Sequence, residues 1–381
     1  MNDEKIWLSS PHMGSDELSY INDAFVSNWI APLGPNVNGF ENDLENYFVE
    51  KNDTINYVCA LNSGTSAIHL ALILLGIKAT DEVICQSFTF SASANPILYQ
   101  GAIPVFVDSE KNTFGMCPEQ LEIAILDRIS KGNKPKAIIA VHLYGMPFDV
   151  EKIIEIAQKY DTPLIEDAAS ALGSSFKGKK CGTFGTIGVV SFNGNKIITT
   201  SGGGALISKS KKIKEKAIFL ATQARDEAPH YQHSNIGYNY RMSNISASIG
   251  RGQVKVLDDH VEKRRAMNQF YKEVFKNIKG VSVVEEPNSD YYSNFWLTTI
   301  LIDENQKVTR EILRIALLKQ NIESRPLWKP LHKQPIFEKY PFYGTTIAEN
   351  LFEKGLCLPS GSNITEEQKN KIKKIICKTF T

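Results

Sequence analysis

From about residue 55, the chain alternates short apolar runs with amphipathic stretches of helical period, and this alternation constrains its fold most strongly. The apolar runs at residues 81–85, 103–108, 136–143, 164–167 and 188–192 have the length and composition of buried strands. The intervening stretches at 67–75, 121–130 and 150–160 repeat apolar residues with helical spacing. Buried strands separated by helices predict βαβ units and an α/β fold, with a mostly parallel mixed sheet flanked by helices.

After about residue 250 the pattern changes. Residues 254–276 predict a long charged helix, 281–284 and 294–302 predict strands, and 309–319 predicts another helix. The final stretch, 365–378, is a basic amphipathic helix that either lies on a membrane surface or docks on its own domain, and we favour docking. We therefore predict a large domain at 1–250 and a smaller C-terminal α+β domain at 251–381, with residues 1–15 able to pack on the small domain.

The overall composition excludes several classes of function. The formal net charge is +1 over 381 residues and no basic stripe stands out, so nucleic acid is not an expected partner. The N-terminus lacks the apolar region of a secretory signal, and the longest apolar stretch, 67–77, is too short to span a bilayer. The six cysteines form no CxxC pair, which predicts free thiols and no metal site. We expect a cytoplasmic protein that does not contact membranes.

Two motifs follow predicted strands in the first third of the chain. Residues 62–67, Asn-Ser-Gly-Thr-Ser-Ala, form a turn of small residues before a helix. The N–H groups of Gly64, Thr65 and Ser66 at such a helix start can bind a phosphate, although an ordinary capped turn has the same composition. Residues 87–93 contain Phe90, which could stack on a flat heterocycle or pack in the core.

An acid and a lysine in the middle of the chain point to a specific cofactor. Asp167 ends the apolar run 163–167 and is followed by two small alanines, and Lys196 stands in Ser191-Phe-Asn-Gly-Asn-Lys before Gly202-Gly-Gly. Pyridoxal phosphate (PLP) requires a lysine amine for covalent attachment and an acid facing its ring nitrogen. The alternatives to a cofactor site are that Asp167 caps a helix and that Lys196 is a solvent-exposed lysine. The glycines around Lys196 favour the cofactor, because glycine marks a close approach of the backbone.

Two further motifs carry candidate ligand-binding residues. Residues 237–244, Gly-Tyr-Asn-Tyr-Arg-Met-Ser-Asn, contain Arg241, which could pair with a phosphate or lie on the surface. Residues 324–332 place Arg325, Trp328 and His332 in a loop stiffened by two prolines. Arginine and tryptophan in a rigid loop indicate ligand contact, and a packed domain interface is the alternative.

The order of these motifs resembles the DegT/DnrJ/StrS family of PLP-dependent nucleotide-sugar aminotransferases, over nearly the whole chain. The resemblance rests on residues 62–67, 166–173, 191–196, 237–244 and 325–332. It implies a fold type I PLP-dependent transferase that acts as a homodimer, with active sites built from both chains.

The resemblance also implies roles for individual residues. Lys196 and Asp167 would be catalytic, Lys196 by binding the cofactor and moving a proton, and Asp167 by pairing with the ring nitrogen. The other cofactor-binding residues would be Gly64, Thr65, Ser66, Phe90, Ser191 and Asn239, with Phe88 replacing Phe90 if needed and Asn239 reaching the neighbouring chain's cofactor. The substrate-binding residues would be Arg241, Arg325, Trp328 and His332.

Two positions depart from the family pattern: Gly203 stands where many members have an acid, and Ser170 where many have His or Gln. The version of the lysine motif here is most similar to the subgroup that makes N-acetylbacillosamine precursors. That similarity implies transfer of an amino group from L-glutamate to C4 of a UDP-linked 4-keto-6-deoxy-N-acetylhexosamine, for bacterial glycan biosynthesis. Three alternatives to this function remain: the same reaction on a GDP- or dTDP-linked keto-sugar, amination at C3, and a regulatory relative without catalytic activity. Dehydratases of this fold replace the lysine by histidine, so the presence of Lys196 disfavours dehydration.

Overall fold

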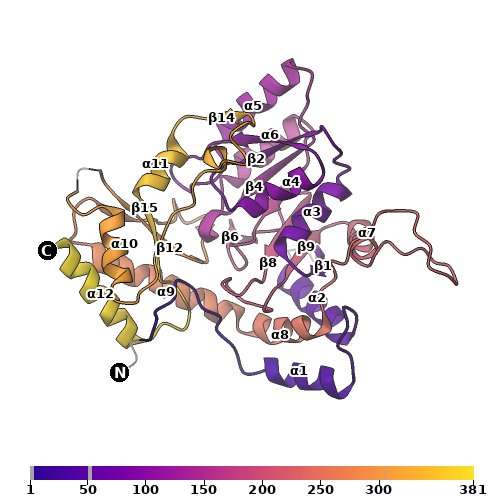
Figure 1. The fold of residues 1–381 in the computed structure, drawn as a ribbon, viewed down its shortest axis with the longest axis horizontal. Coiled ribbons are helices and arrows are strands. Elements are labelled where there is room, and N and C mark those ends of the chain that lie inside the picture. Colours follow the sequence, from indigo (N-terminus) through magenta and orange to yellow (C-terminus); the bar gives the residue numbers. More distant parts are fainter. Residues whose placement is uncertain (1–3, 50–53, 305) are drawn as a thin grey trace.

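A computed structural model describes residues 4–49, 54–304 and 306–381, and an eight-stranded sheet forms its centre (Figure 1). The strand order is β1-β9-β8-β5-β4-β2-β3-β14. Strands β3, β2, β4, β5 and β8 run parallel, and β9 is antiparallel to both β8 and β1. The predicted mixed, mostly parallel α/β sheet is therefore confirmed. The strands are β1 (Tyr57–Leu61), β2 (Glu82–Gln86), β3 (Ile103–Val107), β4 (Ala137–Val141), β5 (Leu164–Asp167), β8 (Ile187–Ser191), β9 (Gly204–Ser208) and β14 (Phe342–Tyr343).

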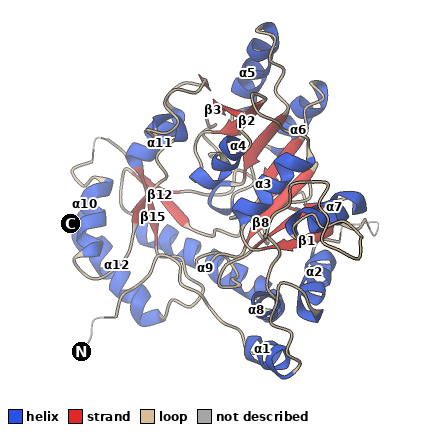
Figure 2. Ribbon diagram, turned by 45° about the vertical axis from the view of Figure 1, so that its right-hand side comes forward, coloured by secondary structure: helices blue, strands red, loops and turns tan. Residues whose placement is uncertain are grey.

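Helices cover both faces of this sheet (Figure 2). Side chains alternate between the faces along each strand, so Cys85 packs against α3 and α7 whereas its neighbour Ile84 packs against α5 and α6. Because both faces are covered, the strands are almost continuously apolar, which is the pattern that the sequence displays. The helices of this part are α1 (Glu17–Val26), α2 (Pro35–Tyr47), α3 (Gly64–Leu74), α4 (Asn95–Tyr99), α5 (Pro118–Ser130), α6 (Val150–Lys159), α7 (Lys211–Ala221) and α8 (Asn244–Lys255).

A second, antiparallel sheet with the order β10-β12-β15-β13 forms the small domain, near both chain ends (Figure 1). The segment after the described start of the chain joins it, because Ile6 pairs with Ile322 and the N–H of Ser360 donates to the carbonyl of Leu8. Residues 1–3 lie outside the described chain. The elements are β10 (Val281–Val283), β12 (Thr298–Ile302), β13 (Arg325–Pro326), β15 (Gly355–Leu358), α9 (Leu257–Phe275), α10 (Arg310–Leu318), α11 (Ile347–Lys354) and α12 (Glu366–Phe380).

Two details differ from the sequence-based expectation. The helix predicted over 254–276 is two helices, because the backbone at Val256 leaves the helical region between α8 and α9. Position 250 lies inside α8, which packs against α1 and α2, so the chain passes between its two parts along a helix pair and not through a linker. In addition, β14 returns from the C-terminal part to pair with β3, while β11 (Tyr291–Tyr292) joins β6 (Ser175–Phe176) and β7 (Lys179–Lys180) in a small sheet.

No helix in the described residues is long and apolar enough to cross a membrane. All six cysteines are free thiols, as the sequence predicts, and four of them are buried.

Candidate active site

A cavity of about 900 Å³ opens at the carboxyl ends of the parallel strands. The start of α3 and the loops after β2, β5 and β8 form one wall, and the small-domain segment from Glu323 to Lys329 forms the opposite wall. Open α/β sheets bind ligands at this edge, because the loops there carry polar groups that the buried strands cannot. The fold therefore brings together motifs that lie more than a hundred residues apart in the sequence.

The start of α3 provides a compact anion cradle in this wall. Gly64 and Thr65 line the cavity together with Ser191 from the end of β8. A Cβ atom on Gly64 would lie 3.2 Å from Cβ of Ser191, and one on Gly204 would collide with the backbone N of Gly64. The two glycines thus allow α3, β8 and β9 to meet closely, with the positive end of the α3 dipole at the cavity.

Ser66 has a different role from the one that the sequence suggested. Its N–H donates to the capping hydroxyl of Ser63 at 3.0 Å, and its own hydroxyl donates to Asn62 Oδ1 at 2.7 Å. Because both groups already have partners inside the turn, Ser66 stabilises the cradle and does not face the ligand. The helix cap, which was the alternative interpretation of this motif, is present alongside the cradle.

Asp167 lies at the end of β5 and lines the cavity. Its Oδ2 accepts a hydrogen bond from the Ser93 hydroxyl at 2.7 Å, and its Oδ1 accepts one from the N–H of Ala169 at 3.0 Å. Each carboxylate oxygen can accept a second hydrogen bond, so lone pairs remain for a donor in the cavity. Small side chains at 168 and 169 leave room for a flat ring beside this carboxylate.

The amine of Lys196 projects into the same cavity. Its Nζ donates to the hydroxyl of Ser170 at 2.9 Å and lies 3.9 Å from the centroid of the Trp296 ring. Burial lowers the pKa of Lys196 to about 8, although the negative charge of Asp167 acts in the opposite direction. A lysine with this pKa supplies a substantial fraction of neutral, nucleophilic amine near neutral pH.

Two aromatic side chains complete the cavity. The ring of Phe90 is exposed and lines the cavity, at 5.9 Å from the ring of Trp328 in the opposite wall. Phe88 is fully buried in the core, so the choice between the two phenylalanines favours Phe90. The backbone N–H of Trp328 donates to the hydroxyl of Tyr144 at 2.9 Å, and this bond holds the small-domain loop against the large domain.

Arg325 lies in the cavity wall with its guanidinium largely exposed. Its Nε and Nη2 atoms both donate to Oε1 of Glu323, at 2.9 and 2.8 Å. The second oxygen of Glu323 accepts the N–H of Leu8 at 3.1 Å. Glu323 thereby orients Arg325 while leaving Nη1 of the guanidinium for an anionic ligand.

Two predicted substrate residues, Arg241 and His332, do not line the cavity of their own chain, and both bond within the protein. The guanidinium of Arg241 is buried and pairs with Glu41 and the carbonyl of Ala60, so it is not available to a phosphate. His332 stacks on Phe342 at 3.7 Å and bonds to Ser87 and Glu349.

Asn239 also lies outside the cavity of its own chain. Its side chain is exposed, and its carbonyl accepts a bond from Asn62 at 3.1 Å. It lies where the segment after α7 returns to the body of the molecule, because its backbone pairs with Thr222 at the end of α7. This placement leaves the predicted contact with a neighbouring chain as a prediction.

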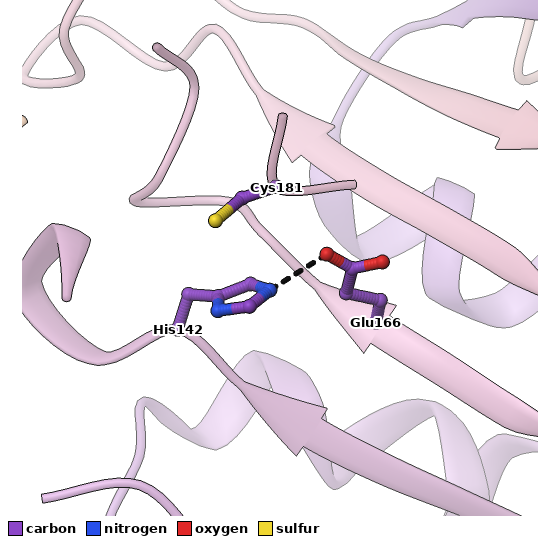
Figure 3. A group of neighbouring side chains, drawn as sticks. All are labelled: His142, Glu166 and Cys181. Carbon is purple, nitrogen blue, oxygen red and sulfur yellow. Dashed lines mark hydrogen bonds and ion pairs between the residues drawn. The ribbon is translucent and has the colours of Figure 1, made fainter. Parts of the chain in front are cut away.

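His142, Glu166 and Cys181 form a buried cluster behind Asp167, with their side chains directed toward one another (Figure 3). Nε2 of His142 donates to Glu166 at 2.7 Å, while Nδ1 accepts the N–H of Phe148. The Glu166 carboxylate also accepts the N–H groups of Gly182, Phe184 and Gly185. These bonds occupy both ring nitrogens of His142 and the carboxylate of Glu166, so these two residues act as a structural network.

Sequence reasoning did not identify Trp296 or Glu323 as cavity residues. Trp296 stands in a predicted strand, where an aromatic residue usually reports packing, and Glu323 precedes the recognised loop by a single residue. Two signals were present in the sequence: the polar pair Ser293-Asn294 directly before Phe295-Trp296, and Glu323 two positions before Arg325.

The fold and this site define a PLP-dependent aminotransferase. Residues 11–377 match the model of the DegT/DnrJ/EryC1/StrS aminotransferase family, and the chain belongs to that family. It is 50% identical over 381 residues to EpsN of Bacillus subtilis (strain 168), which is named as a pyridoxal phosphate-dependent aminotransferase, covering 99% of this chain and 96% of EpsN. It is 40% identical over 359 residues to GDP-perosamine synthase of Escherichia coli O157:H7, covering 94% of each.

A solved structure supports the same assignment. A DegT DnrJ EryC1 StrS aminotransferase from Brucella abortus matches with a TM-score of 0.87 and 30% identity, over 96% of this chain and 95% of that one. The protein is accordingly a PLP-dependent sugar aminotransferase. The residues present fit PLP: a helix-start cradle for the phosphate, an exposed aromatic ring, a carboxylate with free lone pairs, and a lysine amine face one cavity.

Proposed function

We propose that this aminotransferase moves the amino group of L-glutamate to C4 of a UDP-linked 4-keto-6-deoxy-N-acetylhexosamine. The product would be UDP-4-amino-4,6-dideoxy-N-acetylglucosamine, for bacterial glycan biosynthesis. The observation that carries the aminotransferase chemistry is the placement of Lys196 and Asp167 in one cavity whose other wall carries Arg325 and Trp328. The choice of sugar rests on the similarity of residues 191–204 to the N-acetylbacillosamine subgroup.

When bound, PLP supplies an electron sink for charge that develops on the reacting carbon. Nζ of Lys196 would attach to the cofactor and, once released, take the proton from the carbon that carries the donor's amino group. Asp167 would hold a proton on the ring nitrogen by its negative charge. Gly64, Thr65 and Ser191 would bind the phosphate, and Phe90 would cover the ring. Glutamate and the keto-sugar would react in turn, in a ping-pong cycle.

Arg325 and Trp328 would contact the substrates at the opposite wall. Glu323 lowers the net charge beside Arg325, which favours a contact with a single carboxylate or phosphate oxygen over binding of a whole diphosphate. The diphosphate therefore requires cations besides Arg325, and Lys329 in the same wall is one of them. We propose that a second copy of the chain supplies the missing contacts.

The proposed homodimer would share its active sites. Large apolar side chains lie exposed on α1, on the turn that follows it and on the segment after α7, and they include Phe25, Trp29, Leu33, Tyr231 and Ile236. Apolar surface of this kind is typical of an interface. Asn239 would reach the phosphate of the cofactor in the partner subunit.

A mixing experiment tests the shared site. The Lys196→Ala and Asn239→Asp variants would each be inactive as homodimers. Refolding an equal mixture would restore about a quarter of the wild-type activity, because half of the dimers are hybrids with one intact site. No recovery, together with a monomeric mass by light scattering, would remove the dimer from the proposal.

The substrate is tested in a single turnover. The enzyme is first converted with glutamate to the form in which the cofactor carries the amino group, and UDP-4-keto-6-deoxy-N-acetylglucosamine is then added. We expect the visible absorbance of the starting enzyme to return and an aminated UDP-sugar to appear by mass spectrometry.

The same assay with other sugars separates the alternatives. Return of the absorbance only with a GDP-linked 4-keto sugar would favour the second candidate, which the 40% identity to GDP-perosamine synthase supports. A dTDP-linked sugar and a 3-keto sugar serve as further comparisons. A response to glutamate without a response to any sugar would discard the nucleotide-sugar assignment.

A further inference from the structure

The amine of Lys196 has two neighbours, the ring of Trp296 and the hydroxyl of Ser170, and both are fixed in place. Nζ of Lys196 lies 3.9 Å from the centroid of the Trp296 ring and donates to Ser170 Oγ at 2.9 Å. Asp167, the nearby carboxylate, is engaged with Ser93 and Ala169 instead. The lysine amine therefore rests against an aromatic face and a hydroxyl group.

Trp296 is held rigidly beside the lysine. Its indole N–H donates a hydrogen bond to the carbonyl of Asn195 at 2.6 Å, and its backbone carbonyl accepts a hydrogen bond from Nη1 of Arg264 at 2.7 Å. Only 3% of the residue is exposed. Because Asn195 directly precedes Lys196, the indole ring and the lysine are tied to the same point of the backbone.

Asn294 places the hydroxyl and the ring together. Its Oδ1 accepts the N–H of Trp296 at 2.8 Å, and its Nδ2 donates to the carbonyls of Ser170 and Leu172 at 3.0 and 2.8 Å. Asn294 itself is fully buried. A single side chain thus connects the segment that carries Ser170 to the segment that carries Trp296.

An aromatic face attracts an ammonium through its quadrupole and offers nothing comparable to a neutral amine. A hydroxyl oxygen accepts an N–H from either form, more strongly from the charged one. Both neighbours therefore favour the protonated state of Lys196, whereas burial favours the neutral state. Transamination requires both states, because the lysine must hold and release a proton whenever its amine is not bound to the cofactor.

We propose that Trp296 and Ser170 form a docking place that holds the ammonium group of Lys196 during the part of the cycle in which the amine is free. This inference rests on the proposed aminotransferase chemistry and names the residues that serve the proton-transferring lysine. Trp296 is a positioning residue, because it acts through Lys196. Ser170 takes part directly, because its hydroxyl accepts the hydrogen bond from Nζ of Lys196.

The variants at Trp296 and Ser170 that test the proposal leave the other charged groups near Lys196 unchanged. On α9, Arg264 reaches the carbonyl of Lys196 at 3.4 Å and His260 bonds to the carbonyl of Ile197 at 3.3 Å. Burial lowers the pKa of His260 to about 4, so it stays neutral. The remaining groups are Asp167 at β5, the Glu323–Arg325 pair, Lys329 and Cys357.

The test measures the pKa of the Lys196 amine in protein freed of cofactor. Lys196 is labelled with trace acetic anhydride at a series of pH values, and its labelling is followed by peptide mass spectrometry. The Trp296→Leu variant should show a pKa lower by about one unit, because the aromatic face no longer stabilises the ammonium. Trp296→Phe should keep most of the wild-type value, and Ser170→Ala should lower the pKa by less than Trp296→Leu does.

Trp328→Leu is the matched control. It removes another cavity indole, 6.2 Å from the Trp296 ring, and should leave the pKa of Lys196 unchanged. An unchanged or raised pKa in Trp296→Leu would overturn the proposal, since it would assign Trp296 a packing role only. If Trp296→Leu does not fold, as judged by circular dichroism, Trp296→Phe combined with Ser170→Ala decides: a pKa equal to the wild-type value contradicts the docking place.

This measurement uses no sugar and no glutamate. A failed single turnover in the wild-type enzyme would therefore reject the proposed substrate without changing the labelling result. An unchanged pKa in an enzyme that turns over normally would reject the docking place alone.

Discussion

Glu166 and Asp167 are neighbours in the chain but lie on opposite faces of β5, and their surroundings differ completely. Glu166 faces the buried side, where His142 and three backbone N–H groups surround its carboxylate (Figure 3). Asp167 faces the cavity, where, among the described residues, the Ser93 hydroxyl and the N–H of Ala169 bond to it. A fully bonded carboxylate fixes structure, and a partly bonded one can still receive a ligand.

The same contrast applies to two cations. Arg264 is buried and donates to the carbonyls of Trp296, Ser360 and Lys196 and to Ser9 Oγ. Lys196 has one hydroxyl and one aromatic face. These four acceptors hold the Arg264 guanidinium in place, although burial lowers its pKa to about 9, whereas the Lys196 amine is held by fewer contacts and has a pKa of about 8.

The largest effect on turnover is expected from substitutions of side chains that face the cavity. Lys196→Ala removes the amine that we propose binds the cofactor and moves the proton, so turnover should fall by at least about 10⁴-fold. The loss of turnover is measured in a steady-state transamination assay with glutamate as the amino donor. Lys180→Ala, which changes a partly buried lysine that contacts Tyr47, is the control and should keep wild-type turnover. Normal turnover in Lys196→Ala would refute the assignment of the lysine.

Asp167→Asn should reduce turnover by about 10²- to 10⁴-fold. The amide keeps the shape but removes the negative charge that holds a proton on the ring nitrogen. Single-turnover absorbance with glutamate reports the loss in the chemical step. Ser93→Ala, which removes one bond to Asp167 but no charge, should cost less than tenfold, on the order of a single neutral hydrogen bond. Equal losses in both variants would mean that Asp167 acts through geometry.

On the buried side, Glu166→Gln should destabilise the protein by about 2–4 kcal/mol, because the amide NH₂ would face N–H donors and leave them unpaired. Activity per folded molecule should change far less than in Asp167→Asn. Urea unfolding measures the stability, and the control Glu122→Gln, which breaks a surface pair with Lys159, should leave it nearly unchanged. A stable but inactive Glu166→Gln would reverse the roles of the two acids.

The pH dependence sharpens this comparison. Burial alone would raise the pKa of Glu166, but the bonds from His142 and from the N–H groups of Gly182 and Gly185 outweigh it and lower the pKa below 4.5. The ionised carboxylate therefore stabilises the fold above pH 4.5, and this contribution disappears as the pH falls through the lowered pKa. The stability difference between wild type and Glu166→Gln should shrink in that acidic range. A stability difference between wild type and Glu166→Gln that does not depend on pH would contradict this role of the ionised Glu166 carboxylate.

The smallest expected effect is a gain in folding stability, whereas Glu166→Gln should cause a loss. The pKa of Lys196 is lowered from 10.5 to about 8, so the lysine destabilises the folded, cofactor-free protein below pH 8. Lys196→Met should raise the stability at pH 7 by about 1–2 kcal/mol, discounted because the side chain is only half-buried. The gain should vanish as the pH rises toward 10.5. Arg264→Met, in contrast, should lower stability at both pH values, because its acceptors lose their donor.

Much of the fold and part of the site were predictable from the sequence. The parallel strands could be recognised because both of their faces are apolar, and the two central motifs could be recognised because Asp167 and Lys196 each follow a strand. Ser66, Arg241 and His332 were assigned to ligands, but in the structure they bond within the protein. Their types are equally suited to both roles, and only the packing of distant segments decides between them.

The sequence by itself indicated most strands and helices of the large sheet, the acid and the lysine that we propose for the chemistry, and the glycines at the start of α3. Periodicity and local turn chemistry are properties of neighbouring residues, so they can be read along the chain. Only the tertiary structure decided which acid faces the cavity, and that Trp296 and Ser170 meet the amine of Lys196. Those relations join segments that are far apart in sequence, and they depend on the side of the sheet to which each side chain points.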